Sequence, residues 1–203
     1  TNMKIGSWNI RGLNTGLKQR EVKDLLQKQK LSVLCLMEPN LTATKFQQLR
    51  TTSFHQWNSE QLEGTNNRSR MLLLWDPLLI HLEIKQWEEQ FIHTIIQCKV
   101  AGTYYAVTFI YGQLSIPSRR LMWESLHQIA SSMDLPWLII GDFNSPLSPV
   151  DKRGGMAVTS YATADFMEFV LMAGMEDLNA TGCLFRWTNG RVVCKLDRAM
   201  VNK

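Results

Sequence analysis

The chain has 203 residues, of which 45% are hydrophobic, 20% charged and 9% aromatic. This composition supplies a packed core and excludes an intrinsically disordered or low-complexity chain. The formal net charge is only +4, which is compatible with a polyanionic partner without requiring one. No apolar run approaches the ~18 residues that a membrane span needs. We therefore expect a soluble protein without a membrane partner.

The four cysteines are scattered, and none forms a Cys-x-x-Cys pair. This argues against a disulfide or zinc framework and favours a reducing compartment. The first residues are strand-like rather than an apolar signal region, so we expect a nuclear or cytoplasmic protein that is not secreted. No repeat or Pro/Ser-rich linker interrupts the chain, which predicts a single domain over residues 1–203.

The first elements follow from hydrophobic patterning. Residues 3–10 read as a strand, residues 17–30 as a surface helix with a narrow apolar stripe, and residues 31–37 as a buried central strand. The middle of the chain is rich in β-branched and aromatic residues in alternation, which predicts strands over 71–75, 78–84, 92–100 and 104–111.

Helical periodicity returns at residues 118–133 and again around residues 166–173, with a buried strand over 136–140 between them. Asn189-Gly190, flanked by strand-like residues 184–188 and 191–200, is the strongest short hairpin signal in the chain. Strands and helices in mixed order predict an α+β fold with layered sheets and helices outside.

Polar residues stand at the ends of these apolar strands. They are Asn9, Glu38, Tyr111, Asp142, Asn144 and Asp197. The i, i+2 spacing of Asp142 and Asn144 places both side chains on one face if the strand continues. Carboxylates and carboxamides gathered at strand ends can bind a hard divalent cation and orient a water. Taken singly, however, each residue reads more simply as part of a turn, a loop or a half-buried surface.

The order of short motifs carries more information than any one of them. The motifs are Ser7–Asn14, Met37-Glu38, Ile110–Gly112, Gly141–Asn144 and Leu196–Arg198. In this order they resemble the endonuclease/exonuclease/phosphatase family. Asp151–Gly155 after Gly-Asp-Phe-Asn, and Trp187–Asn189 before Leu-Asp-Arg, resemble the endonuclease of plant LINE-type (non-LTR) retrotransposons.

This resemblance implies a four-layer α/β/β/α sandwich (DNase I-like) and Mg²⁺- or Mn²⁺-dependent nicking of DNA. By the same resemblance Glu38 is the principal metal ligand and Asn9 assists it. The remaining implied roles are orientation or deprotonation of water by Asp142, phosphate binding and catalysis by Asn144, Tyr111 and Asp197, and substrate contacts by Thr188, Arg11 and Arg153.

The sequence also departs from the family pattern. The family closes with a Ser-Asp-His-x-Pro-like segment whose histidine pairs with the acid matching Asp197, and the present sequence ends before it. We therefore expect a sandwich without its last strand or strands, impaired catalysis, and a homodimer formed through an open sheet edge at residues 191–200. Pro39 is further expected to restrict Glu38 to extended backbone conformations.

Two alternatives stay open at this point. One is a catalytically inactive nucleic-acid-binding or protein-interaction module derived from a retrotransposon endonuclease. The other is a different phosphoesterase of the same family, such as an abasic-site endonuclease.

Overall fold

The computed structural model describes residues 3–64, 66–179 and 181–202. The chain divides into two compact units, residues 1–104 and residues 105–203. The expected single domain over 1–203 stays a prediction, and each unit is described below by itself.

The first unit combines helices with a mixed sheet. Its helices are α1 (Gly16–Gln29) and α2 (Ala43–Thr52). Its strands are β1 (Ile5–Asn9), β2 (Val33–Met37), β3 (Asn58–Glu63), β4 (Ser69–Trp75), β5 (Ile80–Glu88) and β6 (Phe91–Cys98). One sheet has the order β1-β2-β4-β3, with β1 and β2 parallel and the other pairs antiparallel, while β5 and β6 form an antiparallel hairpin.

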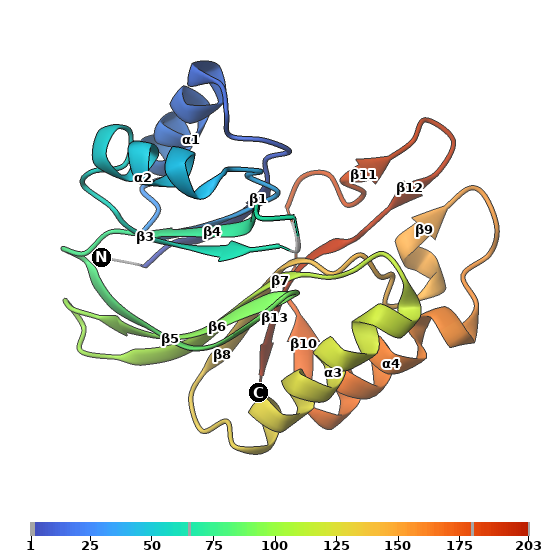
Figure 1. Cartoon of the computed structure of the whole chain (residues 1–203). Helices are drawn as coiled ribbons and strands as arrows, with labels where there is room; N and C mark the ends of the chain where they lie inside the picture. Colours follow the sequence, from blue (N-terminus) through green and yellow to red (C-terminus); the bar gives the residue numbers. More distant parts are fainter. Residues whose placement is uncertain (1–2, 65, 180, 203) are drawn as a thin grey trace. The chain divides into compact units, whose positions relative to one another are not determined.

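Both helices of this unit cover one face of the β1-β2-β4-β3 sheet (Figure 1). Each is capped at its N-terminus by the preceding threonine, Thr15 or Thr42, whose hydroxyl accepts a hydrogen bond from a backbone N–H of the first turn at 3.3 Å. The apolar stripes of the helices pack on the alternate residues of the strands that face them. This core includes Val22, Leu26, Leu34, Leu36, Phe46, Leu49, Leu72 and Leu74.

The second unit contains helices α3 (Ile116–Ser131) and α4 (Ser160–Met172) and a short 3-10 turn, η1 (Pro149–Asp151). Its strands are β7 (Tyr104–Tyr111), β8 (Trp137–Asp142), β9 (Lys152–Arg153), β10 (Met175–Asp177), β11 (Trp187–Thr188), β12 (Val193–Cys194) and β13 (Asp197–Asn202). Strands β10, β13, β8 and β7 are neighbours in that order, and β11, β12 and β9 form a small separate sheet.

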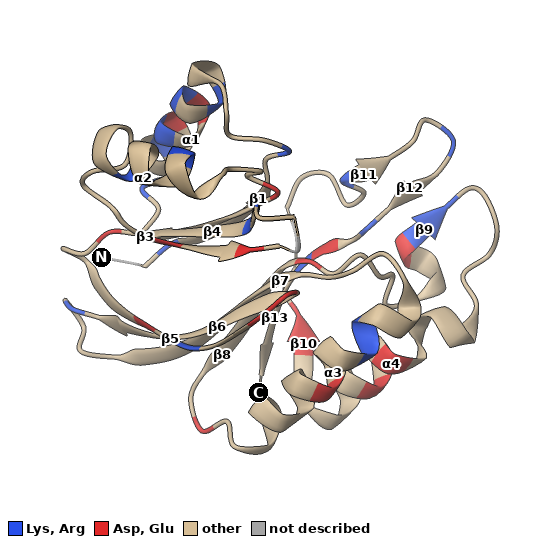
Figure 2. Ribbon diagram, viewed as in Figure 1, with Lys and Arg blue, Asp and Glu red and all other residues tan. Residues whose placement is uncertain are grey.

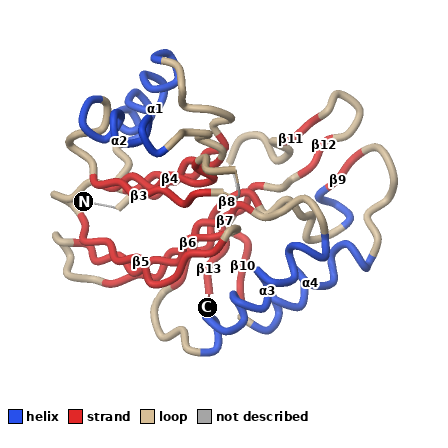
Figure 3. Tube along the Cα trace, viewed as in Figure 1, coloured by secondary structure: helices blue, strands red, loops and turns tan. Residues whose placement is uncertain are grey.

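Helices α3 and α4 lie side by side (Figure 3). Aromatic rings from the two helices stack on each other. The Trp123 ring of α3 stacks on Phe166 of α4 with centroids 4.7 Å apart, and Phe143, directly after β8, stacks on Phe166 at 4.9 Å. Phe143 is fully buried. Because Phe143 lies between Asp142 and Asn144 in the chain, this aromatic cluster anchors the turn that carries both polar residues.

The expected strands and helices up to residue 173 are present, but the last hairpin differs from its prediction, since the strand expected over 184–188 is reduced to β11. The expected strand over 191–200 is divided into β12 and β13, which belong to different sheets. Strand β13 pairs with β8 on one side and with β10 on the other. The expectation of an open edge at this segment is therefore wrong, and with it the basis for a homodimer at that edge.

Within the described ranges, no helix is both long enough and apolar enough to span a membrane. All four cysteines are free; Cys183 is exposed, whereas Cys35, Cys98 and Cys194 are buried. Burial raises the pKa of the Cys35 thiol, which keeps that sulfur protonated.

Candidate functional site

In the first unit, Asn9 and Glu38 form a hydrogen-bonded pair at the ends of two parallel strands. Asn9 is the last residue of β1 and lies in register with Met37, the last residue of β2, which Glu38 follows. The Asn9 Nδ2 group donates a hydrogen bond of 3.1 Å to Glu38 Oε1. Asn9 Oδ1 is buried and accepts no hydrogen bond from the residues that the structure describes. Burying an oxygen atom without a hydrogen-bond donor costs free energy of folding. Such an atom is typical of a position at which a ligand binds.

The backbone at this pair is held in a sparsely populated conformation. Glu38 has φ +53° and Asn40 has φ +52°, so the expectation that Pro39 keeps Glu38 extended is wrong. The carbonyl groups of Glu38 and Pro39 accept hydrogen bonds from Gly12 N at 2.7 Å and Leu13 N at 2.9 Å. Non-glycine residues persist at positive φ only where surrounding contacts over-determine them, and such positions cluster at functional sites.

The donor set of this pair fits a hard cation. Mg²⁺ prefers oxygen ligands and usually keeps several waters, so it is bound by one or two carboxylates rather than by a protein cage. A Glu38 carboxylate beside the unsatisfied Asn9 Oδ1 matches that requirement. Among the described residues, no three His, Cys, Asp or Glu side chains gather as ligands. The pair thus suits a hydrated Mg²⁺ or Mn²⁺ better than a zinc-type site.

In the second unit, Asp142 and Asn144 are joined by a turn rather than by an extended strand. Strand β8 ends at Asp142, and Asn144 has φ +47°. The Asn144 backbone N–H donates to Asp142 Oδ1 at 3.0 Å, and Asn144 Nδ2 donates to the Gly112 carbonyl at 2.8 Å. The strand therefore does not continue to Asn144 as the spacing argument required. The turn nevertheless joins the Asp142 carboxylate to the Asn144 backbone.

Two glycines allow the backbones of this site to approach each other. A Cβ on Gly112 would lie 2.5 Å from the Phe143 carbonyl oxygen, and one on Gly141 would lie 2.0 Å from the Ile110 carbonyl oxygen. Both distances are far below van der Waals contact. The Tyr111-Gly112 and Gly141-Asp142 motifs thus contain glycine because the strand ends that carry the polar side chains are packed against each other.

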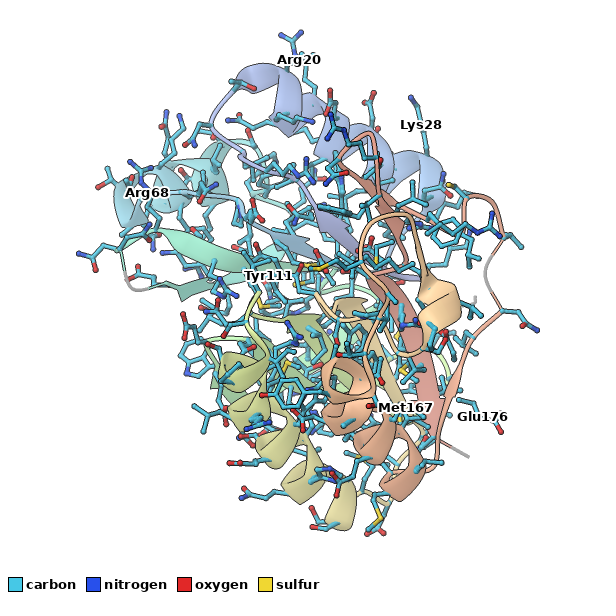
Figure 4. The ribbon with its side chains drawn as sticks, turned by 90° about the vertical axis from the view of Figure 1, so that its right-hand side faces the viewer. Arg20, Lys28, Arg68, Tyr111, Met167 and Glu176 are labelled. Atoms are coloured by element: carbon cyan, nitrogen blue, oxygen red, sulfur yellow. The ribbon has the colours of Figure 1, made fainter. Side chains whose placement is uncertain are left out.

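Asp142 stands in a row of three polar residues across neighbouring strands. Tyr111 of β7 is its partner in the parallel register, and Asp197 of β13 is its partner in the antiparallel register. Tyr111 is labelled in Figure 4. Burial raises the pKa of Asp197, and the charge of Arg186 opposes that rise. Two carboxyl groups directly opposite each other destabilise a sheet, and such arrangements are characteristic of functional sites.

The expected substrate-binding residues lie on exposed segments. Thr188 ends β11, and its Oγ1 accepts a hydrogen bond of 3.0 Å from Gly190 N within the hairpin turn. The Arg153 guanidinium of β9 lies 5.0 Å from the centre of the Phe185 ring. Arg11, in the first unit, is exposed with φ +52°. Thr188 and Arg153 therefore belong to the small β11-β12-β9 sheet, and their part in substrate binding stays a prediction.

An ion cluster of the buried Asp151 and Arg198 with the half-buried Asp177 and Lys195 was not predicted from the sequence. A signal for it was present, because Arg198 follows Val192, Cys194 and Leu196 on the apolar side of an alternating segment. A charged residue on an inward-facing position requires a buried partner of opposite charge.

Residues 6–203 match the Endonuclease/Exonuclease/phosphatase family, and the chain belongs to that family. Its members are metal-dependent hydrolases, nucleases and phosphatases among them.

Solved structures resemble the chain over nearly its whole length. The endonuclease domain of TRAS1, a telomere-specific non-LTR retrotransposon, matches with TM-score 0.73 and 11% identity, over 98% of this chain and 83% of that one. The AP endonuclease LMAP from Leishmania major matches with TM-score 0.75 and 15% identity, over 99% and 79%. The 3′ phosphatase NExo from Neisseria, bound to a product DNA hairpin, matches with TM-score 0.67 and 17% identity, over 99% and 87%.

At these identities the likeness shows the fold alone. It confirms the α+β, DNase I-like fold class that the sequence predicted.

Proposed function

We propose that the chain is a Mg²⁺-dependent endonuclease that nicks DNA, in the manner of retrotransposon endonucleases. The observation that carries this proposal is the Asn9–Glu38 pair with its buried, unsatisfied Asn9 Oδ1. Glu38 and Asn9 would hold the cation, which when bound neutralises phosphate charge and stabilises the leaving oxygen. The order of motifs and the retrotransposon neighbour support the endonuclease assignment.

The residues of the second unit take the remaining roles in this proposal. The Asp142 carboxylate orients the attacking water or accepts its proton. Asn144 uses one Nδ2 hydrogen for the Gly112 carbonyl and has a second for a phosphate oxygen. The Tyr111 hydroxyl is a further phosphate donor. Because its pKa is raised, Asp197 holds a proton more readily than an exposed aspartate does.

A metal-binding measurement tests the first part of the proposal. Calorimetric titration with Mg²⁺ and with Mn²⁺ should show weak binding that Glu38→Gln abolishes, because the substitution removes the only charged ligand in the proposed pair. Glu168→Gln, at an exposed position of α4, is the matched control and should bind as the parent does. Equal binding in the Glu38 variant would place the cation elsewhere.

A nicking assay tests the activity. Supercoiled DNA should be nicked with Mg²⁺ and not after chelation, and Asp142→Asn should lower the rate by about 10²- to 10⁴-fold. Full activity in that variant would indicate a contaminating nuclease. Binding of DNA by an inactive, folded parent would favour the binding-module alternative, and faster cleavage at an abasic site would favour an abasic-site endonuclease.

A further inference from the structure

A largely buried ion cluster is centred on Arg198, the residue that follows Asp197 in β13. The Arg198 side chain is 2% exposed and pairs through Nη2 with Asp151 and through Nη1 with Asp177. Lys195 Nζ lies 2.6 Å from Asp177 Oδ2. Two carboxylates thus face two cations, so the cluster is neutral as a whole. Burying such charges is costly unless each is paired, which makes every member dependent on the others.

Asp151 connects this cluster to the loop that follows Asn144. Its Oδ2 accepts hydrogen bonds of 2.8 Å from the backbone N–H groups of Leu147 and Ser148. Its carbonyl oxygen accepts a hydrogen bond of 2.8 Å from Lys195 N. A single residue therefore fixes both the loop after Asn144 and the segment that leads into β13.

Asp197 and Arg198 act on opposite sides of β13, since consecutive residues of a strand point to opposite faces. In the antiparallel pairing of β13 with β8, Asp197 is the register partner of Asp142 and Arg198 that of Gly141. Phe143 N donates a hydrogen bond of 3.0 Å to the Leu196 carbonyl, which joins the same two segments again. Through Asp151, Arg198 thus connects the start of β13, which carries Asp197, to the loop that follows Asn144.

We propose that Arg198 is a positioning residue for Asp197 and Asn144, acting through Asp151 and Asp177. The inference rests on the proposed function, and it joins two sequence motifs, Asp151–Gly155 and Leu196–Arg198, to which no common role was assigned. Arginine suits the task because its planar fork reaches two carboxylates at once, whereas a lysine ammonium is a point charge.

Three variants separate positioning from charge balance. Arg198→Met leaves an excess negative charge buried in the cluster. Arg198→Met with Asp151→Asn restores neutrality, while an asparagine Oδ1 still accepts from the loop N–H groups. Arg198→Lys keeps the charge but loses the fork. Thr108→Val is the matched control, because it removes a buried 2.8 Å hydrogen bond from Trp137 elsewhere in the same unit.

The first measurement is the kinetics of nicking beside the melting temperature. Arg198→Met should lower kcat by about 10- to 100-fold with KM nearly unchanged, as small misplacements of catalytic groups do. Arg198→Lys should fall between Arg198→Met and the parent. The double variant should regain melting temperature but not kcat. Recovery of kcat together with the melting temperature would show that Arg198 only balances charge, and would overturn the proposal.

The second measurement does not need activity. Amide hydrogen exchange at Phe143 and Lys195 should quicken at least about tenfold in the double variant and stay unchanged in Thr108→Val, because the exchange rate reports local opening. Unchanged exchange at both amides would overturn the proposal. An inactive parent would contradict the proposed function. The exchange rates at Phe143 and Lys195 would then still show whether Arg198 positions these two segments.

Discussion

Gly141 occupies a position that no other residue fits. It has φ +149°, and an added Cβ would lie 2.0 Å from the Ile110 carbonyl oxygen. Gly141→Ala should therefore lower the free energy of unfolding by ~3 kcal/mol or more, since backbone must move to admit the methyl group. Gly16→Ala is the control, because nothing lies within 4 Å of its Cβ position. Equal denaturant midpoints for parent and Gly141→Ala would contradict this reading of the strand packing.

Asp197 should cost stability at neutral pH. Burial raises its pKa above the unfolded value, so the folded chain disfavours the charged form. The cost is absent below the unfolded pKa and develops as the pH rises through the folded pKa. Asp197→Asn should accordingly raise the melting temperature at pH 7, with little effect near pH 3.5, while it lowers any nicking rate. A lower melting temperature of Asp197→Asn at pH 7 would show that the folded protein stabilises the charged Asp197 carboxylate.

His93 should make the chain sensitive to mild acid. Burial lowers the pKa of this β6 histidine from 6.5 to about 4. Its neutral form is thus favoured in the folded chain, and its contribution to stability is complete above pH 6.5 and lost as the pH falls towards 4. The loss amounts to about 3 kcal/mol at most, at 1.36 kcal/mol per pKa unit. Chemical denaturation at pH 7 and pH 5 measures this loss. In His93→Gln the free energy of unfolding should differ less between the two pH values than in the parent. An unchanged difference would show that other groups cause it.

The polar residues at strand ends could be predicted from sequence because each interrupts an apolar run, as Glu38 does after β2. Their local geometry could not be. The positive φ of Glu38 depends on the carbonyl–amide bonds to Gly12 and Leu13, which are remote in sequence. The turn at Asn144 depends in the same way on the Gly112 carbonyl.

At the scale of elements, the Asn189-Gly190 hairpin is fixed by its own turn. Asn189 Oδ1 accepts hydrogen bonds from Arg191 N at 3.1 Å and Val192 N at 2.9 Å. Asn189→Ala should therefore loosen β11 and β12 by about 1 kcal/mol without lowering the global melting temperature, because the turn is exposed. Faster exchange at the Val192 amide would confirm it, whereas a cooperative loss of protection throughout 105–203 would show that the hairpin supports the whole unit.

Long periodic elements followed from the sequence, and short or interrupted ones did not. Helix α2 escaped prediction because Phe46 and Leu49 alone are buried in it. The alternation across residues 191–200 suggested one strand, but Lys195 N donates to the Asp151 carbonyl instead of to a neighbouring strand. This tertiary hydrogen bond and the one from Phe143 N to the Leu196 carbonyl lie between β12 and β13, and the local sequence pattern predicts neither of them.

At the scale of the whole molecule, the positive charge is unevenly distributed along the chain. Residues 1–104 contain 13 Lys and Arg against 9 Asp and Glu, whereas residues 105–203 contain 9 of each. Several of the basic residues belong to α1 (Figure 2). The side chains of Arg20 and Lys28 extend into solvent (Figure 4). The excess of four charges therefore belongs to the first unit alone.

The proposed DNA binding should consequently weaken as the salt concentration is raised. Each phosphate contact adds about −0.9 to the slope of log affinity against log salt for duplex DNA. Arg20→Gln with Lys28→Gln should flatten that slope if these side chains meet phosphates in solution. Fluorescence anisotropy between 50 and 200 mM salt, an interval chosen on the order of the physiological range, measures it. Salt-independent binding would argue against a phosphate-directed surface.

The burial of three of the four cysteines allows unfolding to be followed by the reactivity of their thiols. Only the exposed Cys183 should react rapidly with an alkylating reagent, because Cys35, Cys98 and Cys194 are buried. Cys35 and Cys98 belong to the unit of residues 1–104 and Cys194 to that of residues 105–203. Pulsed alkylation followed by peptide mass mapping would thus time the opening of each unit separately, without any introduced label.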